Sequence, residues 1–154
     1  MDDSLRKKAG KIIVVLIILT LAFIWYNSSL SRVESADISR GFLADIAAFL
    51  KELGISIDST EDHFLRKLAH FFEFGLLGAE LIMLPIIYGK CSAQAVLNCL
   101  FFGLTAAVID ETIQIFSDRG SLVSDIWIDF SGVAAAVIVI LIIYSIVYKR
   151  KSDG

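Results

Sequence analysis

Long apolar runs separated by short polar segments dominate the chain. A helix of about 20 apolar residues crosses the hydrocarbon core of a bilayer, and four runs are close to that length or longer. The helices that they predict cover residues 11–27, 64–88, 92–116 and 125–148. The pattern therefore predicts an all-α fold, an integral membrane four-helix bundle that forms a single domain, 1–154.

The first apolar run has two interpretations, a cleaved signal peptide or a retained helix. The run extends to Trp25-Tyr26, an aromatic pair of the kind found at membrane interfaces. The next residues, Asn27-Ser28-Ser29, contain no A-x-A cleavage pattern. We therefore expect this run to remain in the protein as its first membrane helix.

The segment between the first two runs has a different periodicity. Its apolar residues recur at helical spacing, and charged residues occupy much of the opposite face. This pattern predicts an amphipathic interfacial helix over about residues 37–53 in the first outer loop. Gly54 suits its C-terminal end, and Asp58-Ser59-Thr60 offers a cap for the next helix.

Basic residues indicate which ends of the helices face the cytoplasm. Most of them fall in short segments that share one side if both termini are inside, namely Arg6, Lys7, Lys8, Lys11, Lys90, Lys149, Arg150 and Lys151. The positive-inside rule therefore predicts a multi-pass protein of the cell (plasma) membrane with cytoplasmic N- and C-termini. Residues 27–66 and 117–124 then lie outside.

Composition agrees with a membrane protein and excludes one class of partner. The chain is 56% hydrophobic, and its mean hydropathy is +0.74. The net charge of -3 and the absence of a basic patch argue against nucleic-acid binding. Cys91 and Cys99 lie too far apart on one helix for a disulfide.

Polar residues inside three of the predicted helices gather on one face of each, at a rotation of about 100° per residue. The start of the second helix, the end of the third and the start of the fourth all lie on the outer side of an up-down bundle. The predicted polar site therefore contains Lys67, His70, Glu73, Asp110, Glu111, Gln114, Arg119 and Asp125. Asp129 and Gly132 continue the line of Asp125 along the fourth helix, and we expect them to be structural.

The charges of the predicted polar site do not balance. Lys67 and Arg119 are the available fixed cations, and they face a larger number of carboxylates. Such crowding favours protonation of some acids, or calls for a cation or a cationic ligand. The cofactor is unknown, but a divalent cation could use His70, Glu73, Asp110, Glu111 and Asp125, although this donor set is not diagnostic of a metal site.

Glu80 is the only acid well inside the predicted bilayer core. A lone carboxylate at that depth is costly. We therefore expect Glu80 to be protonated or hydrogen-bonded, with Asn98 or Thr105 as the candidate partner.

The polar residues form three ordered blocks that resemble the VanZ-like family. The blocks are Lys67-Leu68-Ala69-His70-Phe71-Phe72-Glu73-Phe74, then Asp110-Glu111-Thr112-Ile113-Gln114 with Arg119, and last Asp125, Asp129 and Gly132. One departure is Phe74, where the family often has tyrosine. The resemblance implies an envelope protein linked to reduced susceptibility to the glycopeptide teicoplanin, and it implies no particular reaction.

The predicted polar site has a structural and a functional interpretation. In the first, ion pairs of Lys67 with Glu73 or Asp110, and of Arg119 with Asp125, hold the helices together. In the second, the site is an outward-facing pocket that binds or modifies the head group of a membrane lipid, a lipid-linked envelope precursor or a glycopeptide. Two other possible functions are an intramembrane metal- or acid/base-dependent hydrolase or transferase, and a small proton-coupled transporter.

Single cysteines test the predicted topology. In a background with Cys91→Ala and Cys99→Ala, we expect Ser4→Cys and Ser152→Cys to react with a membrane-impermeant thiol reagent only after the cells are permeabilised. Labelling of either position in intact cells would overturn the topology and move the polar site to the cytoplasmic face.

Overall fold

Four long helices make up nearly all of the computed structural model, which describes residues 2–30, 62–117 and 122–152. The helices are α1 (Asp3–Ser29), α3 (Asp62–Ile87), α4 (Ala93–Phe116) and α5 (Val123–Ser152). Each one is long and apolar enough to cross a membrane. The predicted all-α four-helix membrane fold is therefore confirmed. The predicted interfacial helix, residues 37–53, lies outside the described residues.

Two helices extend beyond the apolar runs that predicted them. α1 begins at Asp3 rather than near residue 11, and an ion pair of 2.7 Å between Asp3 and Lys7 supports its exposed first turns. α5 continues to Ser152 rather than ending near residue 148. Hydropathy marks where a helix meets lipid, whereas polar flanking residues can prolong the helix into water.

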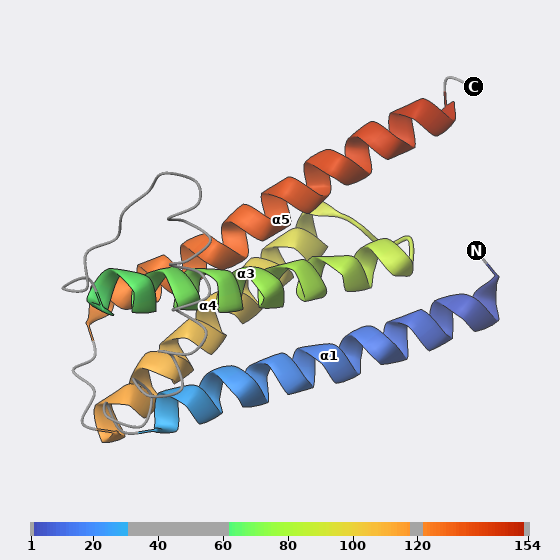
Figure 1. Cartoon of the computed structure of the whole chain (residues 1–154). Helices are drawn as coiled ribbons and strands as arrows, with labels where there is room; N and C mark the ends of the chain where they lie inside the picture. The colour runs from blue at the N-terminus through green and yellow to red at the C-terminus, as the bar shows by residue number, and fades with distance from the viewer. Residues whose placement is uncertain (1, 31–61, 118–121, 153–154) are drawn as a thin grey trace, which may run out of the picture.

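The helices alternate in direction, so their ends fall into two groups (Figure 1). Both chain termini lie at the same end of the molecule as the connection between α3 and α4. The end of α1, the start of α3, the end of α4 and the start of α5 lie at the opposite end. The predicted gathering of the polar helix ends on one side is thus present.

A tight turn reverses the chain between α3 and α4. Gly89 has a φ of 64°, in the left-handed region that a side chain disfavours. The Lys90 N–H donates to the Pro85 carbonyl at 2.8 Å, which closes the end of α3. Ser92 then caps α4, because its hydroxyl accepts from the Ala95 N–H at 3.2 Å.

Glycine allows α3 and α5 to cross in close contact. A Cβ atom built on Gly132 of α5 would collide with the Phe71 carbonyl oxygen of α3 and lie 3.1 Å from the Gly75 nitrogen. A Cβ atom on Gly78 would lie 2.7 Å from the Cα of Val133. Small residues let membrane helices approach at backbone distance, so these two glycines fix where the helices meet.

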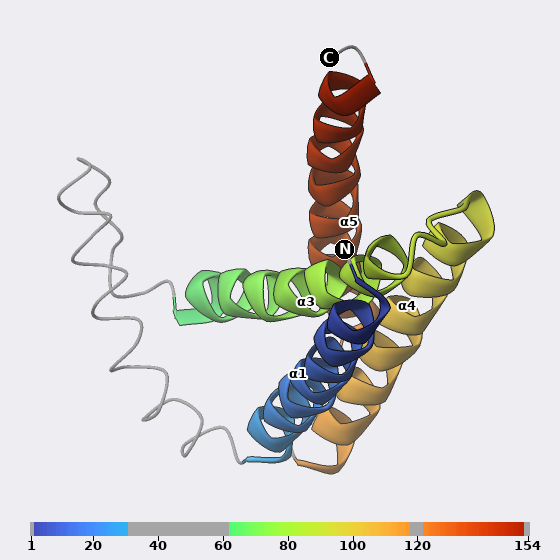
Figure 2. The ribbon, with the colours of Figure 1, turned by 90° about the vertical axis from the view of Figure 1, so that its right-hand side faces the viewer.

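Beyond this crossing, α5 turns away from the other three helices (Figure 2). Of the four candidate membrane spans, that of α5 is the least buried. The second half of α5 exposes a series of large apolar side chains, among them Ile138, Val139, Ile142, Ile143, Ile146 and Val147. Such a surface suits contact with lipid rather than with water.

Glu80 is buried at the contact between α3 and α1. The Thr20 hydroxyl of α1 donates to Glu80 Oε1 at 3.0 Å. The expected partners, Asn98 and Thr105, are both exposed and bond within α4 instead, to Gln94 and to the Phe101 carbonyl. The expectation of a hydrogen bond to Glu80 was right, but its proposed partners were wrong.

A methyl group at the helix crossing should destabilise the fold. We expect Gly132→Ala to lower the free energy of unfolding by about 1–3 kcal/mol through overpacking, although alanine gains about 1 kcal/mol in helix propensity. Gly75→Ala is the matched control, because its Cβ would meet the Gly132 carbonyl oxygen at an ordinary 3.6 Å. Thermal unfolding in detergent measures both. Equal stability of the two variants would contradict the close crossing.

Candidate functional site

Polar side chains from three helices meet at the end of the bundle opposite the chain termini. They come from the first turns of α3, the last turns of α4 and the first turns of α5, which all lie on the same side of the molecule in Figure 1. Four polar side chains of α4 and α5 at this end are almost fully buried, namely Asp110, Glu111, Gln114 and Asp129. We call the residues that make the contacts described below the polar cluster, namely Lys67, His70, Asp110, Gln114, Asp125 and Asp129.

An ion pair forms the outer rim of the polar cluster. Lys67 Nζ of α3 lies 2.8 Å from Asp125 Oδ1 of α5, and the two side chains are 25% and 14% exposed. The sequence suggested Glu73 or Asp110 as the partner of Lys67, so this pairing is a correction. Its cause is the close crossing of α3 and α5, which brings their first turns side by side. The other suggested pair, Arg119 with Asp125, includes a residue outside the described ones.

The inner part of the polar cluster is a histidine between two buried carboxylates. His70 Nδ1 lies 3.8 Å from Asp110 Oδ2 of α4 and 3.7 Å from Asp129 Oδ1 of α5. Both separations exceed the length of a hydrogen bond. Gln114 Nε2 donates to Asp110 Oδ2 at 2.8 Å and thereby orients this carboxylate. Three helices thus each contribute one ionisable group to the same point.

Asp129 is the functional candidate that the sequence analysis undervalued. It was expected to be structural, yet its side chain is 2% exposed and faces His70. A signal was present, because Asp129 follows Asp125 by one helical turn and shares its face. What the sequence could not show is the distance between α3 and α5, which decides whether Asp129 meets lipid or the site.

The other predicted site residues take less central positions. Glu111 is buried and lies beside the polar cluster, and Glu73 is half-buried on α3. Arg119 lies outside the described residues. Phe74, one turn from His70, is fully buried in the apolar core. Gly132 contributes through the helix crossing, because it admits the backbone of Phe71, the residue after His70.

The cavity inside this site is small. Its volume is about 10 Å³, and it is lined by Arg66, Lys67, His70, Glu111, Gln114, Asp125, Ile128 and Asp129. That volume is close to the space that a single water molecule needs. A water or a small ion fits there, whereas a lipid head group would have to bind on the rim instead of inside the cavity.

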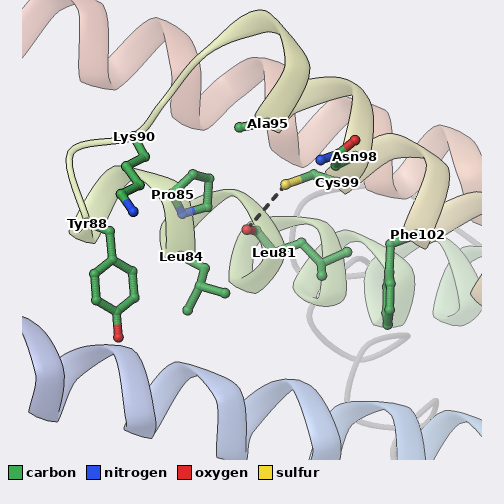
Figure 3. A pocket seen from close by; sticks show the side chains of 9 residues that line it. All are labelled: Leu81, Leu84, Pro85, Tyr88, Lys90, Ala95, Asn98, Cys99 and Phe102. Carbon is green, nitrogen blue, oxygen red and sulfur yellow. Dashed lines mark hydrogen bonds between the residues drawn. The ribbon is translucent and has the colours of Figure 1, made fainter.

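A larger cavity of about 490 Å³ lies near the opposite end, between α3 and α4 (Figure 3). Its lining is largely apolar and contains no carboxylate or histidine. Within it, the Cys99 thiol donates to the Leu81 carbonyl at 3.4 Å. The Tyr88 ring points toward α1 in Figure 3, where Gly10 leaves room for its hydroxyl. Among the described residues, it is the polar cluster and not this cavity that brings a histidine and carboxylates together.

Comparison with known proteins assigns the chain to a family but gives no template for the site. A sequence profile for the family described as VanZ/LLP1 matches residues 13–144, which is most of the chain and contains the whole polar cluster. This match confirms the resemblance that the three polar blocks indicated. No curated protein and no solved structure matches the chain.

A double-mutant cycle tests the rim ion pair. We expect Lys67→Met and Asp125→Asn to show a coupling energy of about 1 kcal/mol or more in the free energy of unfolding, because both groups are largely shielded from water. The matched control is the exposed pair of Asp3 and Lys7 on α1, whose side chains are 78% and 67% exposed. Its coupling should be about 0.5 kcal/mol or less. Equal coupling in the two pairs would show that Lys67 and Asp125 do not meet in a shielded site.

Proposed function

Because the chain belongs to the VanZ/LLP1 family, we propose that it is an envelope protein of the plasma membrane that binds a polar head group at the polar cluster. The ligand is the head group of a membrane lipid or of a lipid-linked envelope precursor. When the protein binds this head group, the glycopeptide teicoplanin has less access to the cell surface. The observation that carries the proposal is the Lys67–Asp125 ion pair, which lies at the mouth of a buried, acid-rich centre.

The proposed orientation places this mouth on the outer face of the membrane. The described basic segments near Arg6 and Lys90 belong to the end of the molecule that carries both termini. Under the positive-inside rule that end is cytoplasmic. The polar cluster, at the opposite end, then meets the outer leaflet, where envelope lipids and their precursors present their head groups.

The geometry favours binding at the rim. Lys67 is partly exposed, and Arg66 beside it lines the same small cavity. Both side chains can donate to a phosphate or another anionic group. The cavity of about 10 Å³ is too small for a head group, so the ligand contacts Lys67 and Arg66 from outside and leaves the buried carboxylates covered.

A hydrolase or transferase is the second candidate function. It is favoured by the position of His70 Nδ1 within 4 Å of Asp110 and Asp129, since histidine and carboxylates are the side chains that most often serve as general acids and bases. A proton-coupled transporter has less support. Glu80 lies ten residues, about 15 Å, from His70 along α3, and the apolar core residues Phe74 and Leu77 occupy the interval.

Teicoplanin susceptibility tests the proposed function. A susceptible heterologous host that produces the wild-type chain should tolerate more teicoplanin than the empty host. We expect Asp110→Asn and His70→Ala, which change the buried groups beneath the rim, to abolish this difference while the expression level and melting temperature stay near wild type. Arg66→Gln, which removes a proposed contact with the head group, should also reduce the difference. Glu80→Gln, which alters another buried acid, is the matched control and should retain the difference.

Three results would contradict the proposal in different ways. A wild-type chain without effect on susceptibility would separate this protein from the teicoplanin phenotype. Loss of folded protein in both site variants would show that the polar cluster is a structural ion-pair lattice. Variants that fold and remain fully active would show that His70 and Asp110 do not contribute.

A further inference from the structure

We propose that His70, Asp110 and Asp129 bind one divalent transition-metal cation inside the helix bundle. One ligand atom from each residue lies within 4.8 Å of those from the other two. The three residues come from α3, α4 and α5, so a bound ion would join these helices at the end where the rim lies.

The separations of the three side chains match a shared ion better than direct bonds. At 3.7 and 3.8 Å, His70 Nδ1 is too far from either carboxylate oxygen for a hydrogen bond. Two ligands of a tetrahedral ion, each at about 2.0–2.2 Å from it, lie about 3.3–3.6 Å apart. For the two histidine–carboxylate pairs, movements of a few tenths of an ångström would therefore reach ligand distance, and the two carboxylates offer oxygens within 4.8 Å of each other.

Asp129 supplies an independent indication of a ligand. Its side chain is 2% exposed, and its Oδ2 atom accepts no hydrogen bond from the described residues. A buried carboxylate oxygen without a donor is costly. A cation bound by both oxygens of Asp129 would remove that cost, and it would also offset the negative charges of Asp110 and Asp129.

The surroundings resemble the second layer of a metal site. Gln114 holds Asp110 through its 2.8 Å hydrogen bond to Oδ2, and ligating carboxylates are commonly oriented in this way. His70 and Asp129 also line the cavity of about 10 Å³, which has room for one water. That water could complete the coordination of the ion.

The donor set indicates the class of cation. One imidazole nitrogen and two carboxylates suit Zn²⁺ or Mn²⁺, whereas sites for Ca²⁺ or Mg²⁺ are built from oxygen alone. Two carboxylates and one divalent ion also form a neutral group, which lowers the cost of charge in the membrane. The metal site does not depend on which head group binds to the rim.

Metal content of the purified protein tests the inference. The full chain in detergent is stripped with a chelator, incubated with Zn²⁺ or Mn²⁺, separated from free ion by gel filtration and analysed by mass spectrometry. We expect about one ion per wild-type chain, and at least a tenfold loss of affinity in Asp129→Asn and His70→Ala. The matched control Glu80→Gln should bind as tightly as wild type.

A second measurement covers the case in which the site variants fail to fold. Co²⁺ is added to the wild-type chain, where bound imidazole and carboxylate ligands should produce d–d absorption bands that excess Zn²⁺ abolishes. A wild-type chain that retains neither Zn²⁺ nor Mn²⁺ and gives no such bands would overturn the inference. Equal binding by folded Asp129→Asn and Glu80→Gln would also overturn it, because the ion would then lie elsewhere.

Discussion

The close crossing of α3 and α5 is the contact on which the rest of the site depends. Gly132 lets the α5 backbone approach the Phe71 carbonyl of α3. Since His70 precedes Phe71, and Asp129 lies one turn before Gly132, the crossing brings a histidine and a carboxylate together. The Lys67–Asp125 ion pair forms one turn further out, at 2.8 Å. A wider separation of the two helices would expose each of these groups to lipid, where an isolated charge is expensive.

The fold was largely predictable because hydropathy and helical periodicity are local properties of the sequence. Four apolar runs gave the four membrane helices. The ends of α1 and α5 were less predictable, since a helix can continue into water wherever its polar residues favour it. The amphipathic pattern of residues 37–53 remains a prediction.

The residues that form the site were predictable only in part, because contacts between helices depend on how each helix is rotated about its axis and how far apart the helices lie. Lys67, His70, Asp110, Gln114 and Asp125 were expected together and do meet. The partner of Lys67 was wrong, and Asp129 was placed outside the functional set. The same limit explains Glu80, whose hydrogen bond crosses to Thr20 of α1, a residue 60 positions away in sequence. No local pattern specifies such a contact.

The central claim is that the buried ionisable groups form a working centre and not merely an ion-pair lattice between helices. In a lattice, His70 would be protonated and would bind Asp110 and Asp129 directly. Anomalous diffraction at the zinc edge, from crystals of the full chain grown with Zn²⁺, distinguishes the two arrangements most directly. We expect a single anomalous peak among His70, Asp110 and Asp129, about 2.0–2.2 Å from each ligand atom. Absence of a peak there, with the imidazole hydrogen-bonded to both carboxylates, would contradict it.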